Sequence, residues 1–280
     1  MNYEDNNEVK AEDRGRRKAV PFIISIAVLT AVVVLAIVFR SRIADLFRET
    51  PDTPANYGAE TLNTDTSDDT AEPPETDDPT KDLPDNPVDF DAQKEINEDI
   101  YAWIYVKDTD INYPILQSRE DDLYYLRRGL DKNYDISGVI FTQLHNKRDF
   151  SDPVTLVYGH NMTGYDVPMF ATLHNFEDEE FFNSHDTFYI YIPGHILTYE
   201  IVSAYKYDNR HIMNFFNFDD EEVRADYFDS VLHPTMIPMM VRAGATLDVD
   251  DKLVVLSTCM PDNTFRYLVN GVLVKDEPTK

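Results

Sequence analysis

The feature that most constrains this 280-residue chain is an uncharged apolar run, AVPFIISIAVLTAVVVLAIVF, which extends from Ala19 to Phe39. A helix needs about 20 apolar residues to cross the hydrocarbon core of a bilayer, so the run predicts one transmembrane helix. Basic residues are more numerous before the run than after it, which favours a cytoplasmic N-terminus at residues 1–18. They are Lys10, Arg14, Arg16, Arg17 and Lys18 on one side and Arg40, Arg42 and Arg48 on the other.

Two other interpretations of this run are weaker. A cleaved secretory signal would have a shorter apolar core, and no small-x-small cleavage site follows in the sequence RSRIADLF. A buried core helix would not be flanked by basic clusters and followed by a polar tract. We therefore expect an uncleaved, single-pass anchor in the cell membrane, with an extracellular main body at residues 90–280.

The segment between the predicted span and this main body, residues 40–89, predicts a flexible acidic stalk. From Pro51 onwards it is rich in Pro, Thr and Asp and poor in large apolar side chains, so it cannot bury enough surface to offset its chain entropy. About 40 such residues would span roughly 35 Å root-mean-square, and more if their charges repel one another. Its acidity could also suit calcium, but the spaced acidic pattern of a calcium-binding loop is absent.

The charge balance and the single cysteine exclude several kinds of site. The formal net charge of -27 repels a phosphate backbone, and no basic stripe follows the N-terminal region, so we expect no nucleic-acid partner. Cys259 is the one cysteine, which rules out an internal disulfide and a Cys-x-x-Cys zinc site. The seven histidines lack H-E-x-x-H spacing. We therefore expect neither a metal nor a cofactor.

The main body contains many predicted strands and few predicted helices. Strand patterns occur at residues 111–115, 138–142, 154–158, 252–258 and 265–274, and TFYIYIPGHILTYEIVSAYKY predicts a hairpin that turns at Pro193-Gly194. No regular alternation of strand and helix is present. The pattern therefore favours a mainly β fold, either a closed barrel or a sandwich, decorated with helices.

Three helices are expected within this body. Helical spacing predicts one where the domain begins, and leucines after Glu120 suggest a short second one. Asp219 followed by Glu222 resembles a capping box and predicts a third helix over residues 219–232. The spacing of the first helix rests on Ile96, Ile100, Trp103 and Ile104, and that of the second on Leu123, Leu126 and Leu130.

Cys259 is the candidate nucleophile. It ends the strand 252–258 and precedes a turn-like segment, so it could be held rigidly and still be reached by a substrate. The alternative is a small buried hydrophobic residue, which is the usual role of a free cysteine. A nucleophilic cysteine also needs a proton donor nearby, and His160 suits that role because it leaves the strand 154–158 at a turn. We interpret the remaining histidines as surface or capping residues: His145, His174, His185, His195, His211 and His233.

Arg266 is the candidate for stabilising an oxyanion. It lies seven residues beyond Cys259 across a short turn, so two adjacent antiparallel strands could place its guanidinium beside the sulfur. An arginine in a strand more often serves as a cross-strand ion-pair partner, and that alternative stays open.

At these residues the chain resembles the sortases. LVYGHNM (156–162), LSTC (256–259) and FRYLV (265–269) match, in order, their His, Cys and Arg motifs. NEDIYAWIYVKDTDINYPILQ (97–117), GVIFTQLHN (138–146) and MFATLHNF with FFNSH (169–185) resemble class B in particular. The resemblance spans residues 90–275. It implies an eight-stranded sortase-type β-barrel with N-terminal helices and a helix inserted before the Cys-bearing strand.

The resemblance also implies an activity. A class B sortase would cleave a C-terminal cell-wall sorting signal of the Asn-Pro-x-Thr type after Thr, forming a thioester on Cys259. His160 would protonate the departing amine, Arg266 would hold the oxyanion, and a peptidoglycan precursor amine would accept the sorting-signal-bearing surface protein. Residues matching the class B substrate groove are Asn112, Leu116 and Ser257. The chain departs from the class at Met260, where some members carry an acid, and in its short interval from Cys259 to Arg266.

Three alternatives to this function remain. A pilin lysine could be the acceptor in place of peptidoglycan, which would make the enzyme a pilin polymerase. Water could take the acyl group, because the same Cys/His pair serves a hydrolase. The third alternative is a non-catalytic adhesive or sensory ectodomain in which Cys259 is only buried.

Overall fold

The computed structural model describes residues 83–260 and 264–280. The predicted anchor at residues 19–39 and most of the predicted stalk lie outside these ranges. Within them, every helix is too short or too polar to cross a bilayer.

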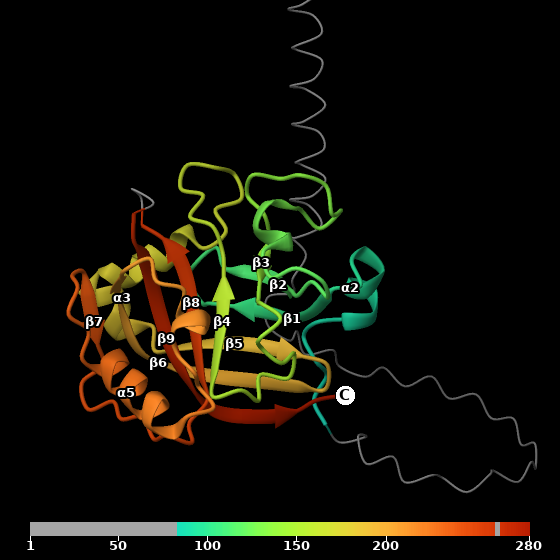
Figure 1. Ribbon diagram of the computed structural model, residues 1–280. Coiled ribbons are helices and arrows are strands. Elements are labelled where there is room, and N and C mark those ends of the chain that lie inside the picture. Colours follow the sequence, from blue (N-terminus) through green and yellow to red (C-terminus); the bar gives the residue numbers. More distant parts are fainter. Residues whose placement is uncertain (1–82, 261–263) are drawn as a thin grey trace, which may run out of the picture. The chain divides into compact units, whose positions relative to one another are not determined.

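Eight strands form a closed barrel in the order β5-β1-β2-β3-β4-β8-β9-β6, and the pairing of β5 with β6 closes the ring (Figure 1). Most neighbours are antiparallel, whereas β2–β3 and β4–β8 are parallel. This confirms the closed, eight-stranded, mainly β barrel. The strands are β1 (Ile100–Tyr105), β2 (Asn112–Leu116), β3 (Ile140–Phe141), β4 (Val154–Tyr158), β5 (Thr187–Ile192), β6 (His195–Tyr207), β7 (Met239–Val241), β8 (Leu253–Cys259) and β9 (Arg266–Pro278).

The long strand β6 explains how a ninth strand joins this barrel. Its first half pairs with β5 across the predicted hairpin, where Ile192 faces His195 and Gly194 adopts a φ of 82°. A positive φ of this kind favours glycine, so the Pro193-Gly194 turn sets the register of the hairpin. The second half of β6 pairs with the short strand β7, on the edge of β6 that also pairs with β5. β7 therefore extends the sheet outside the closed ring.

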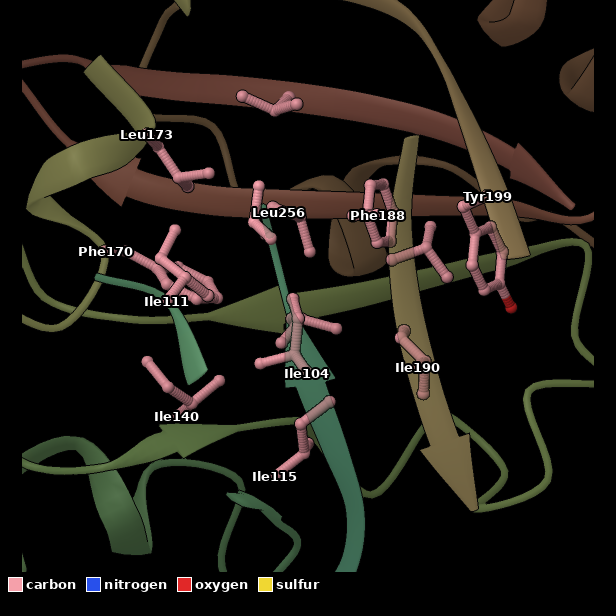
Figure 2. Close-up of a cluster of buried hydrophobic side chains, with 14 of the residues drawn as sticks. Ile104, Ile111, Ile115, Ile140, Phe170, Leu173, Phe188, Ile190, Tyr199 and Leu256 are labelled. Carbon is pink, nitrogen blue, oxygen red and sulfur yellow. The ribbon is translucent and has the colours of Figure 1, made fainter. Parts of the chain in front are cut away.

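The sheet formed by β4, β8, β9 and β6 is buried on both faces. Along β8, Val254 and Leu256 point into the barrel, whereas Leu253 and Val255 join a second apolar cluster that includes residues of α5. Two buried faces account for the continuous apolar sequence LVVL, because an alternating pattern arises only where one face meets water. Figure 2 shows the barrel interior, with Ile104, Ile115, Ile140, Phe188, Ile190, Tyr199 and Leu256 converging between the strands.

α2 precedes the first strand, and the other helices lie in the connections between strands. The inserted helix α5 covers the outer face of the sheet, and Tyr227, Phe228 and Val231 are its buried side chains. It is the helix predicted before the Cys-bearing strand, although its N-cap is Asp220 and not Asp219. The helices described are α2 (Phe90–Ile96), the 3-10 helices η1 (Tyr124–Arg127) and η2 (Ala171–Glu177), α3 (Glu179–Ser184), α4 (Ile212–Phe215) and α5 (Glu221–Leu232).

The first predicted helix is present as α2 but is shorter than its apolar spacing indicated. The helical spacing from Ile96 to Ile104 does not form one face of a helix, because α2 ends at Ile96 and residues 100–105 form β1. Both faces of β1 are buried, and Ile100 and Ile104 belong to different apolar clusters. A short strand buried on both faces cannot be distinguished from a helix by its apolar spacing alone. The helix expected after Glu120 is shorter than predicted, a single 3-10 turn, and Leu123 before it is exposed.

Candidate active site

Three strand ends meet at one rim of the barrel. β4 runs parallel to β8, with Tyr158 beside Ser257, so His160 leaves the sheet two residues after the end of β4. β8 runs antiparallel to β9, and Cys259 lies directly opposite Arg266 in the register. The pairing of these strands therefore gathers all three residues at the same end of the sheet.

The sulfur of Cys259 is in direct contact with a cation. Arg266 Nη1 lies 3.2 Å from Cys259 Sγ and donates a hydrogen bond to it. The thiol is free and only partly buried, so it is open to a reactant. A guanidinium at this distance can balance negative charge on the sulfur, or on an oxygen bonded to a carbon under attack. The geometry suits a nucleophile and does not match a cysteine sealed in apolar packing.

His160 is oriented by a backbone carbonyl. Its Nε2 lies 2.7 Å from the carbonyl oxygen of Leu126. A carbonyl only accepts hydrogen bonds, so Nε2 carries a proton and Nδ1 is the nitrogen left to exchange one. The backbone on either side is held as well, because Gly159 N donates to Ser257 O at 3.1 Å and Phe170 N donates to His160 O at 2.9 Å.

Gly159 has a steric reason to be glycine. A Cβ at this position would lie 2.6 Å from Ile140 Cδ1 and 2.6 Å from the ring of Phe170. Contacts that close require the neighbouring side chains to move. The close approach lets the chain leave β4 tightly and places His160 next to the strand that carries Cys259.

The three residues line one small pocket. Tyr158 forms part of its wall and donates from its hydroxyl to Gln143 Oε1 at 3.1 Å. Burial raises the pKa of Tyr158, and the nearby charge of Arg266 opposes that rise only in part, so the hydroxyl stays protonated. The lining residues are Leu126, Phe141, Tyr158, Gly159, His160, Ser257, Thr258, Cys259 and Arg266.

The three predicted substrate-binding residues lie in different places. Ser257 is in the wall of this pocket. Leu116 is fully buried and packs in an apolar cluster with Tyr125 and Phe141, which gives it a place in the core. Asn112 Oδ1 accepts a hydrogen bond from Trp103 Nε1 at 2.6 Å and is not among the residues that line the pocket.

Sequence reasoning missed two residues that contact Cys259. We expected His174 to be a surface or capping residue, but its Nε2 lies 3.0 Å from the carbonyl oxygen of Cys259. Asn161 Nδ2 donates to the same oxygen at 3.1 Å. Asn161 stands in the string that resembles the sortase His motif and His174 in one that resembles class B, yet nothing in their spacing predicts this contact. Across residues 83–260 and 264–280, no cluster of three or more His, Cys, Asp or Glu side chains could bind a metal ion.

Comparisons with known proteins agree with this architecture. No model of a known protein family matches the chain. Sortase B of Listeria monocytogenes is 32% identical over 187 residues, which cover 66% of this chain and 73% of that protein. The crystal structure of Clostridium perfringens sortase B is 29% identical, with a TM-score of 0.59 over 66% of this chain and all of that chain. A Streptococcus pyogenes class B sortase involved in pilus biogenesis is 29% identical, with a TM-score of 0.56 over 67% of this chain and 98% of that chain.

The barrel and these relatives define a cysteine transpeptidase of the sortase type. Within that type, the chain belongs to the class B sortases. Membership in an enzyme family sets aside the adhesive or sensory ectodomain as an account of the domain.

Proposed function

We propose that this transpeptidase cleaves an Asn-Pro-x-Thr-type sorting signal after Thr and transfers the released protein to a peptidoglycan amine. The observation that carries the proposal is the 3.2 Å contact between Arg266 Nη1 and Cys259 Sγ in a pocket that also holds His160. A nucleophile, a cation and a proton-exchanging ring in one pocket supply the groups that acyl transfer through a thioester requires.

In the first half of the reaction, the Cys259 thiol passes its proton to Nδ1 of His160, and the sulfur attacks the carbonyl carbon of the Thr residue. Negative charge develops on the carbonyl oxygen, and the Arg266 guanidinium stabilises it. The carbon–nitrogen bond then breaks, and His160 gives the departing amine a proton from Nδ1. The product of this half is a thioester between the sulfur and the Thr carbonyl.

In the second half, an acceptor amine attacks the thioester carbon. His160 takes the proton that the amine loses, an amide bond forms, and the carbon–sulfur bond breaks to free Cys259. Because water could attack in the same way, exclusion of water or a high local concentration of amine decides between transfer and hydrolysis. Ser257 lines the same pocket, which supports a role for it in binding the peptide.

The proposal includes a location. A helix at residues 19–39 would hold the enzyme in the cell membrane with residues 1–18 in the cytoplasm, and an acidic stalk at residues 40–89 would carry the catalytic domain outside. The support is the length of the uncharged run and the excess of Lys and Arg before it. Tethering would raise the effective concentration of a membrane-held substrate without any new contact.

The test is product analysis of peptide cleavage by the full-length chain and its Cys259→Ala variant. We expect the wild-type chain to cleave an Asn-Pro-x-Thr peptide after Thr, to join it to an added peptidoglycan-type amine, and to lose both activities in the variant. Full cleavage by Cys259→Ala would refute the proposal. Release to water alone, unchanged by added amine, would show a hydrolase instead.

A second acceptor is favoured by one observation, the likeness to the S. pyogenes class B sortase involved in pilus biogenesis. A pilin lysine would then replace the peptidoglycan amine in the second half of the reaction. Competition between the two amines in one reaction distinguishes them, because the preferred acceptor dominates the amide products.

A further inference from the structure

His174 lies against the end of β8 although 85 residues separate it from Cys259 in the sequence. The 3-10 helix η2 carries it, and its side chain is 17% exposed. One ring nitrogen, Nδ1, lies 2.5 Å from Glu177 Oε1, and the other, Nε2, lies 3.0 Å from the carbonyl oxygen of Cys259. His174 thus joins a carboxylate to the main chain of the candidate nucleophile.

The hydrogen-bonding partners fix the protonation of this ring. An ionised carboxylate and a backbone carbonyl both only accept hydrogen bonds. Each nitrogen of His174 faces one of these acceptors, so each must carry a proton for both bonds to form. His174 is therefore an imidazolium, whose charge is balanced by Glu177.

The bond to His174 helps to fix the peptide that follows the nucleophile. The Cys259 carbonyl oxygen accepts from both His174 Nε2 and Asn161 Nδ2, and Met260 N donates to Phe265 O at 3.0 Å. With both sides of the Cys259–Met260 peptide held, the Cα–Cβ direction of Cys259 is set, which limits the sulfur to the few positions that rotation about this bond allows. The bond from Met260 N to Phe265 O is the last backbone pairing described before residues 261–263, which lie outside the described ranges.

His174 also contacts the strand that carries the other partner of the sulfur. Its ring stacks on Tyr267 with centroids 4.9 Å apart and an interplanar angle of 26°. Tyr267 is fully buried and follows Arg266 in β9. One side chain thus contacts both of the strands whose pairing places Cys259 opposite Arg266.

The titratable groups around His174 come from three elements. Glu177 lies on η2, Cys259 on β8, and Arg266 and Tyr267 on β9. Burial, reinforced by the charge of Glu177, raises the pKa of Tyr267, so its hydroxyl stays neutral at ordinary pH.

We propose that His174, held as an imidazolium by Glu177, is a positioning residue that fixes the main chain of Cys259 and turns the positive end of the His174–Glu177 ion pair toward the nucleophile. In naming Cys259 the nucleophile, the inference rests on the proposed function. Among the other histidine–carboxylate pairs of the described residues, His195 and Asp276 are the most similar in distance, with Nδ1 and Oδ1 2.6 Å apart. This pair joins the hairpin turn to the far end of β9, away from Cys259, and provides a matched control.

The experiment measures the rate at which iodoacetamide alkylates Cys259 in the full-length chain as a function of pH, without any peptide. Glu177→Gln keeps a hydrogen-bonding side chain of the same size but removes the charge that requires an imidazolium, and His174→Gln removes the cation itself. We expect both variants to move the midpoint of the profile up by ~0.5 pH unit, which is roughly a threefold lower rate near neutrality. Asp276→Asn should match the wild-type profile, and profiles of all four proteins that coincide would overturn the inference.

A second measurement covers the case in which a variant fails to fold. Nitrogen-15 spectra of the histidine rings of the wild-type chain, with the His174 ring assigned through its own backbone signals, should show both nitrogens of His174 protonated at neutral pH. A neutral His174 ring would overturn the inference. Neither measurement needs a sorting peptide, so a chain that cleaves no peptide but shows these results would refute the proposed function and support this inference.

Discussion

The two halves of the site are held in place by different means. Cys259 and Arg266 face each other because of the antiparallel register of β8 and β9, which is set by a continuous ladder of backbone hydrogen bonds. His160 and His174 come from connecting segments, and each of them contacts a backbone carbonyl oxygen through one ring nitrogen. One such bond contributes only about 1 kcal/mol net.

The two halves therefore differ in how rigidly the barrel holds them. The strand-borne half, Cys259 and Arg266, is part of the sheet and can move only if the sheet rearranges. The loop-borne half, His160 and His174, depends on how η1, η2 and the turn after β4 pack against the barrel. We therefore expect the loop-borne half to respond more strongly to small changes in packing.

The largest expected effect on the loop-borne half comes from His160→Ala. The departing amine would lose its proton donor, so kcat/KM for peptide cleavage should fall by about 100-fold to 10,000-fold. The free energy of unfolding should change by only about 1 kcal/mol, the net value of the bond to Leu126. Peptide cleavage assays and urea unfolding check the two expectations. A rate within about twofold of the wild type would remove His160 from the reaction.

Arg266→Ala tests the strand-borne half. Loss of the guanidinium beside the sulfur should lower kcat/KM by about 100-fold to 1,000-fold, because the developing oxyanion loses its cation. Arg266→Lys keeps the charge but loses the forked geometry, so it should recover only part of this rate. If Arg266→Ala cleaves peptide at the wild-type rate, its contact with Cys259 has no catalytic role.

Two glycine substitutions compare the halves directly. A Cβ at Gly159 would lie 2.6 Å from Ile140 Cδ1, and one at Gly271 would lie 2.4 Å from Phe188 Cε1. Gly159→Ala and Gly271→Ala should each lower the free energy of unfolding by about 1–3 kcal/mol through overpacking. Only Gly159→Ala should also lower kcat per folded molecule, because Gly159 precedes His160, whereas Gly271 lies in the interior of β9.

Unfolding curves together with cleavage rates separate the two effects. Equal loss of kcat in both glycine variants would contradict the idea that the loop-borne half is the more sensitive one. Unchanged kcat in Gly159→Ala, at the expected loss of stability, would contradict it as well.

The sequence predicts most of the barrel because its strands have strong patterns. The apolar runs of β4, β8 and β9 and the Pro-Gly hairpin are found in the structure close to where their sequences predict them. β1 was missed because both of its faces are buried, and its apolar residues happen to match helical spacing. β7 was missed because its three residues, Met-Met-Val, are too few and too uniformly apolar to show a strand pattern in the sequence.

The site also contains contacts that the sequence predicts and contacts that it does not. Cys259 and Arg266 are only seven residues apart in the sequence, at the ends of two predicted strands, so strand pairing alone could predict that they meet. The contact of His174 with Cys259 depends on how η2 packs over the strand ends, and no local pattern encodes that. Leu116 is matched to the substrate groove by its motif alone, and the structure shows that its apolar side chain is fully buried in the core.

The central claim is that the sulfur of Cys259 forms a thioester with a substrate Thr carbonyl. Mass spectrometry of the full-length chain isolated from cells tests it most directly, with hydroxylamine used to cleave the thioester. The account predicts an acyl adduct on Cys259 that ends in Thr, is released by hydroxylamine, and is missing from Cys259→Ala. An active enzyme that carries no such adduct under trapping conditions, or that carries it on another residue, would contradict the account.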